Sequence, residues 1–193
     1  MVLYYLIDRK KRILLSLCAI GIATLLNGIF SYLNEMANLP IFLDSVFTVM
    51  TAALFGLWPA VAVGLLSNSF LELLNGFPGY YVPFTVVNLS TALITALFVY
   101  KKKFETATHA FWLIIILATV NSLMGALIVT FVFGGYTNLS MDNMVRGIIV
   151  TGQSLYTSTF FVRIIVNIVD KGLSVLPSFF LYKKIQAYSI SEK

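Results

Sequence analysis

The chain has 193 residues, of which 59% are hydrophobic and 11% are charged, and its mean hydropathy is +0.91. A water-soluble domain of this length cannot bury so much apolar surface, so the composition excludes soluble classes and indicates one integral membrane domain, 1–193. The formal charge of +5 would suit a nucleic-acid binder, but the basic residues cluster at the ends of apolar runs. Such clusters are a topology signal, so the expected partner is the lipid bilayer and not a nucleic acid.

The apolar runs are continuous and do not alternate with polar residues, which is typical of membrane helices and not of closed barrels. We therefore predict an all-α fold. A crossing needs about 20 apolar residues. The sequence predicts a polytopic bundle of six transmembrane helices, over residues 13–33, 41–56, 59–75, 82–100, 110–133 and 154–182. Ser140 is the expected N-cap of a short interfacial helix over 140–152.

Basic residues at the helix ends predict the orientation. The first apolar run follows Arg9–Arg12, as in a secretory signal peptide, but no small-x-small cleavage pattern follows it. Its length favours a retained helix. If the chain crosses the membrane six times, Lys101–Lys103 and Lys183–Lys184 lie on the same side as the first basic run. The predicted loops on the opposite side contain one basic residue, Arg146. Both termini are therefore expected in the cytoplasm.

Two acids stand at matching ends of neighbouring helices. Helices 41–56 and 59–75 are joined by a tight break at 56–59, and Asp44 and Glu72 lie near their far ends. Because the two helices cross the same layer in opposite directions, both carboxylates are expected close to one membrane face.

Five of the predicted helices carry a polar stripe, with residues spaced so that they share one helical face. The stripes are Thr24, Asn27 and Ser31; Asp44, Thr48 and Thr51; Asn68, Glu72 and Asn75; Asn88, Thr91 and Thr95; and Arg163, Asn167, Asp170 and Ser174. An unpaired charge at the bilayer centre costs about 2.5 to 3.5 kcal/mol on insertion scales, so these faces should point inward. Their number favours a polar pocket over helix packing alone.

The charged residues of the stripes allow two interpretations. Glu72 and Arg163 could form a salt bridge between the third and sixth helices, or they could contact a ligand. Asp170 and Lys171 are expected to find other partners, because adjacent residues diverge by about 100° on a helix. His109 is the only histidine, so we expect no metal site.

Small residues on the first helix predict close packing. Ala19 and Ala23 form a small-xxx-small pair, and Gly21 and Gly28 lie on nearly the opposite face. One face can pack within the bundle and leave the other for a neighbour. Whether that neighbour belongs to another protein stays open at this point.

These motifs, in this order, resemble the substrate-binding S component of energy-coupling factor transporters. The Ala19-x-x-x-Ala23 helix is followed by LPIFLDS at 39–45, FGLWPA at 55–60 and GLLSN at 64–68, which are similar to the second and third helices of many such proteins. Asp170-Lys171 in the last helix is also similar. The resemblance covers nearly the whole chain in layout and these short stretches in sequence.

The resemblance implies a mechanism. Such proteins capture a vitamin or related micronutrient from outside a prokaryotic cell. The pocket lies between helices four to six, and the loops after helices one and three cover it. Such proteins then dock onto a transmembrane coupling subunit with two ATPase subunits, and toppling in the plasma membrane exposes the pocket inward. For this chain the caps would be 34–40 and 75–81, with docking through Ala19 and Ala23 and no cofactor or metal. The implied ligand contacts are Asn34, Glu72, Tyr80, Asn88, Asn121, Arg163 and Asn167.

No Walker-type phosphate loop occurs in the sequence. The chain is therefore not expected to be an enzyme, which fits a subunit driven by partner ATPases. A membrane-embedded sensor is an alternative, but it would normally feed a signalling domain, and only about ten residues follow Tyr182. An intramembrane enzyme could use Asp44 and Glu72 as paired carboxylates, although no His or Cys stands with them. The sequence does not identify the ligand.

Overall fold

The structure is a computed structural model that describes residues 9–137 and 141–191, so the expected N-cap Ser140 lies outside the described residues. Within these ranges every regular element is a helix, which confirms the all-α prediction. In chain order they are α1 (Arg9–Met36), α2 (Val46–Phe55), α3 (Leu57–Leu74), the 3-10 turn η2 (Val82–Phe84), α4 (Thr85–Tyr100), α5 (Ala107–Phe131), α6 (Asp142–Ile149) and α7 (Leu155–Ser191).

Five helical stretches are long and apolar enough to cross a membrane: α1, α3, η2 with α4, α5 and α7. The sixth predicted crossing, 41–56, is different. Only its second part is helical, since α2 has 10 residues and is therefore about 15 Å long, half the thickness of a hydrocarbon core. Asp44 thus precedes the helix, and the predicted shared face with Thr48 and Thr51 is wrong.

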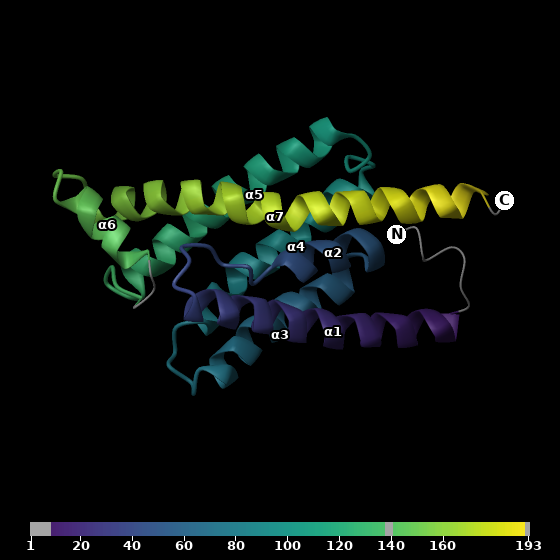
Figure 1. Ribbon diagram of the computed structural model, residues 1–193, viewed down its shortest axis with the longest axis horizontal. Coiled ribbons are helices and arrows are strands. Elements are labelled where there is room, and N and C mark those ends of the chain that lie inside the picture. The colour runs from purple at the N-terminus through teal and green to yellow at the C-terminus, as the bar shows by residue number, and fades with distance from the viewer. Residues whose placement is uncertain (1–8, 138–140, 192–193) are drawn as a thin grey trace.

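When the short α2 is counted, successive helices from α1 to α5 alternate in direction along one axis, and α7 runs opposite to α5 (Figure 1). The first residues of α1 and the last residues of α7 lie at the same end, as does the connection between α4 and α5. Three groups of basic residues, 10–12, 101–103 and 183–184, therefore gather there, and we call it the basic end. The connections 37–45 and 75–81, and the described residues 132–137 and 150–154, lie toward the opposite end.

One cluster of buried apolar side chains lies toward the basic end. Phe104 is completely buried, and its ring lies 5.4 Å from that of Phe179 and 5.5 Å from that of Tyr182. Buried side chains of α2, α5 and α7 complete this core. Alanines of α2, α3 and α4 form a second cluster, and their small side chains let these helices approach closely.

The small residues of α1 face in different directions from those expected. Ala23 is buried and Ala19 is half-buried. Gly28 also faces the bundle, because an added Cβ would lie 2.2 Å from a ring atom of Phe70, whereas a Cβ on Gly21 would meet nothing within 4 Å. The open face of α1 is thus that of Gly21 and its neighbours. The docking role of Ala19 and Ala23 stays a prediction.

Candidate functional site

A cavity of about 320 Å³ lies in the half of the bundle away from the basic end. Its wall combines the end of α1, the segment 37–45, the second half of α3, the segment 75–81, η2 and the start of α4, the middle of α5 and the first half of α7. Five of the implied ligand contacts line it, namely Asn34, Tyr80, Asn121, Arg163 and Asn167, whereas Glu72 and Asn88 do not. The role of these residues in ligand binding stays a prediction.

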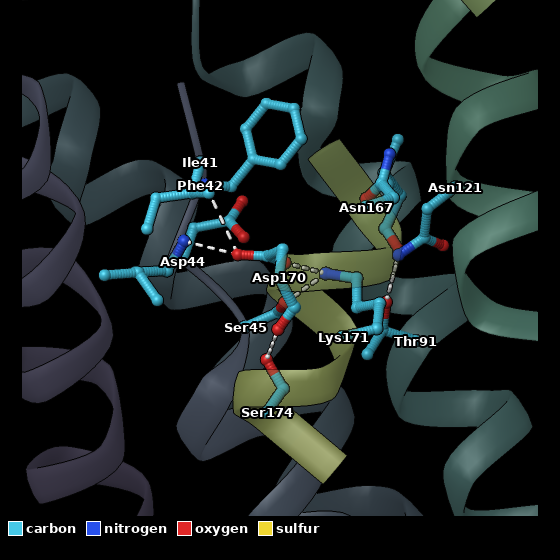
Figure 2. A network of polar contacts seen from close by, with 12 residues as sticks. Ile41, Phe42, Asp44, Ser45, Thr91, Asn121, Asn167, Asp170, Lys171 and Ser174 are labelled. Carbon is cyan, nitrogen blue, oxygen red and sulfur yellow. Dashed lines mark hydrogen bonds and ion pairs between the residues drawn. The ribbon is translucent and has the colours of Figure 1, made fainter. Parts of the chain in front are cut away.

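The non-helical segment before α2 is held by a buried carboxylate of α7 (Figure 2). The backbone N–H groups of Phe42 and Leu43 donate to Oδ1 of Asp170, at 3.3 and 2.7 Å. Successive amides that converge on one anion form a backbone nest. Leu43 adopts a positive φ of 54°, which is unfavourable for a residue with a Cβ. The two bonds to Asp170 hold the backbone in this conformation.

Other polar side chains form hydrogen bonds with backbone carbonyl groups of this segment. Asn34 of α1 donates to the carbonyl of Ile41 at 2.6 Å, and Asn88 of α4 donates to the carbonyl of Asp44 at 3.1 Å. These bonds replace the helical ladder that residues 41–45 lack. They are the physical reason why the helix begins at Val46 and not at the predicted residue 41, and they give Asn88 a structural position outside the cavity wall.

Asp170 and Lys171 pair with each other, so the expectation that each finds a different partner is wrong. Nζ of Lys171 lies 2.7 Å from Oδ2 of Asp170 and donates to Oγ of Ser45 at 2.6 Å. The long lysine side chain can bridge the angle between adjacent helical positions. Both residues are buried, at 0% and 2% exposure, so each charge depends on the other.

Glu72 has a role that the sequence did not reveal. Its carboxylate accepts hydrogen bonds from the backbone N–H groups of Gly79, Tyr81 and Val82, the last two at 2.9 and 3.2 Å. An acid at this position caps the start of η2 and α4 and orders the loop that precedes them. The predicted alternative of a Glu72–Arg163 salt bridge is wrong, because Asp170–Lys171 is the ion pair that the described residues form.

The ordered loop places the phenol of Tyr81 on the cavity wall beside Glu35 of α1. Tyr81 donates through its hydroxyl to Oε2 of Glu35 at 2.7 Å, and Asn68 donates to the Tyr81 carbonyl at 2.9 Å. Burial and the bond to Glu35 raise the pKa of Tyr81, so the phenol stays protonated. Sequence reasoning missed Glu35 and Tyr81. Glu35 lies four residues after Ser31, so an extension of the first polar stripe would have found it.

Arg163 is a buried cation with aromatic neighbours and no carboxylate within ion-pair distance among the described residues. Its guanidinium carbon lies 4.9 Å from the ring centre of Phe84 and 5.4 Å from that of Phe42. The residue is 5% exposed and lines the cavity, yet no carboxylate of the described chain lies within ion-pair distance. Gly125 of α5 makes room for it, because an added Cβ would lie 2.8 Å from Nη1. Cation–π contacts stabilise the charge only in part.

Hydrogen bonds join the remaining helices at the cavity. Asn121 of α5 donates to Oγ1 of Thr91 at 2.8 Å, and Asn167 of α7 donates to Oγ of Ser122 at 3.0 Å. These bonds fix α5 to α4 and to α7 at the depth of the cavity. Over residues 9–137 and 141–191, no cluster of three His, Cys, Asp or Glu side chains could hold a metal ion.

Comparison with protein-family models, curated proteins and solved structures finds no match to this chain.

The coupling of the buried pair can be measured by a double-mutant cycle. Asp170→Asn and Lys171→Met should each lower the free energy of unfolding by about 3 to 5 kcal/mol, because each leaves one buried charge unpaired. The double variant should lose at least about 1 kcal/mol less than the sum of the two. Unfolding in detergent micelles measures all three, and Lys183→Gln, at an exposed position, serves as the control. Additive losses would contradict the pairing.

Proposed function

We propose that the chain is a substrate-binding S component of an energy-coupling factor transporter, which captures a vitamin or related small water-soluble micronutrient. The observation that carries the proposal is Arg163, a buried cation on a cavity wall with no carboxylate partner. A ligand anion would supply the missing counter-charge through the planar guanidinium fork. This would also explain why so many polar side chains line a cavity within an apolar bundle.

The layout supports the proposal. The segments 37–45 and 75–81 contribute to the cavity wall; the first overlaps the implied cap 34–40, and the second is the implied cap 75–81. In the proposed topology, α2 and the segment before it complete a sixth passage through the membrane. The basic end would then face the cytoplasm with both termini, and the cavity would open to the outside of a prokaryotic cell.

The partners follow from the same proposal. Uptake would be driven by two ATPase subunits and a transmembrane coupling subunit that docks on α1. Exposed apolar side chains along that helix, such as Leu17 and Ile22 at 60% and 59% exposure, give a protein or the lipid a continuous surface to cover. Ala19 and Ala23 belong to the proposed docking region, although the buried Ala23 would contribute through the spacing of α1 from the bundle.

The role of Arg163 is tested with a charge-matched pair of variants. Arg163→Gln should weaken binding of the compound that the wild-type protein retains by more than tenfold, because the anion loses its counter-ion. Arg146→Gln, at an exposed position on α6, should leave affinity unchanged. Isothermal titration of ligand-depleted protein measures both. Equal affinity of the two variants would contradict a ligand contact at Arg163, and thermal melting checks that both are folded.

The proposed orientation is tested by cysteine labelling in intact cells. Cys18 is exposed, so it is first replaced by Ala. Lys102→Cys should then react with a membrane-impermeant maleimide only after the cells are opened, whereas Gln153→Cys, between α6 and α7, should react from outside. The reverse pattern would place the basic end outside and overturn the topology.

The transport and sensing hypotheses predict different partner proteins, which co-isolation can identify. Mild detergent extraction of the tagged chain from its native host should co-isolate a coupling subunit and two ATPase subunits, identified by mass spectrometry. Co-isolation of a signalling kinase without ATPase subunits would contradict the transport proposal. A tagged, unrelated six-helix membrane protein controls for nonspecific recovery.

A further inference from the structure

The charges around the cavity are unequal once internal pairs are removed. Glu35, Asp44, Arg163 and Lys171 all line it. Lys171 pairs with Asp170 at 2.7 Å, so the other charged groups on the cavity wall are two carboxylates and one guanidinium. A ligand that carried only negative charge would therefore meet more acid than base.

The two carboxylates differ in their environment. Glu35 already accepts a hydrogen bond from the hydroxyl of Tyr81 at 2.7 Å. Asp44 is partly exposed, lines the cavity and has no cationic side chain of the described residues within ion-pair distance. Its backbone carbonyl is held by Asn88 at 3.1 Å, so its position is set by the same bonds that anchor the segment before α2.

Asp44 and Arg163 are thus opposite charges that line one cavity without forming an ion pair. We infer that the ligand is zwitterionic, with an anionic group at Arg163 and a protonated amine or other cationic group at Asp44. Each ligand charge would find a fixed counter-charge, which is the electrostatic complementarity that specific sites use. The inference rests on the proposed function, because it assigns the chemical class of the ligand bound at the same site.

Two further features agree with a small ligand of this class. A volume of about 320 Å³ lies at the lower end of the range for small-molecule sites, about 300 to 1,000 Å³. Aromatic rings, among them those of Tyr80 and Phe84, also line the cavity and can stabilise a cation.

The test identifies the small molecules that the purified protein retains. Wild-type protein isolated from its native host is denatured, and the released compounds are identified by mass spectrometry in both ion modes. We expect a compound with an acidic and a basic group. Its retention should fall at least tenfold in Asp44→Asn and in Arg163→Gln and be largely restored in Asp44→Glu. Glu105→Gln removes a carboxylate that does not line the cavity and should retain as much as wild type.

The outcomes separate this inference from the proposed function. A retained acid without a basic group, or full retention by a folded Asp44→Asn variant, overturns the zwitterion and leaves the S-component proposal standing. No compound retained by folded wild-type protein, relative to an unrelated membrane protein from the same host, overturns both. If Asp44→Asn does not fold, the titration of wild-type protein decides: the retained compound should bind at least tenfold more tightly than its N-acetylated derivative, and equal affinity overturns the inference.

Discussion

The contact between Asp170 and the backbone of Phe42 and Leu43 determines how the polar half of this molecule is built. A buried carboxylate must replace the hydrogen bonds that water would give it. Asp170 does so with two amides of another segment and the ammonium of Lys171. The segment before α2 therefore stays non-helical, α2 is short, and residues of this segment line the cavity.

The anchoring of this segment by Asp170 also positions Phe42 and Asp44 next to the cavity. Phe42 belongs to the anchored segment, and its ring lies 5.4 Å from the guanidinium carbon of Arg163. Asp44 belongs to the same segment and lines the same cavity. A pair on α7 thus determines where an aromatic ring and a carboxylate stand around a buried arginine. The apolar core toward the basic end, centred on Phe104, gives these elements a rigid base.

Much of this arrangement could be predicted from the sequence, because it depends on patterns along the chain. Continuous apolar runs identified the helices, and polar residues at helical spacing indicated which faces point inward. Asn121, Arg163 and Asn167 line the cavity and belong to helices whose direction is regular, so their side-chain positions follow from the period. The start of α7 at Leu155 lies within one residue of the predicted start at 154.

The remaining features depend on contacts between backbone groups and distant side chains, which no spacing rule describes. The spacing of polar residues allows Glu72 as a partner of Arg163, but three amides of the next loop satisfy its carboxylate. The apolar neighbours of Asp44 predict a helix that includes it, and the bonds to Asp170 hold this segment in a non-helical conformation. Asp170 and Lys171 pair because a lysine side chain is long enough to reach its neighbour. A helical projection places side chains by their spacing alone, so it describes neither contacts with a distant backbone segment nor the reach of a long side chain.

The most direct measurement is hydrogen exchange at the amides of Phe42 and Leu43, followed by NMR in micelles. If Asp170 binds both N–H groups in a buried nest, both amides should exchange at least a hundredfold more slowly than the amide of Gln153, an exposed residue between α6 and α7. Exchange of Phe42 and Leu43 as fast as that of Gln153 would show that the segment is not anchored and would contradict this account of the cavity.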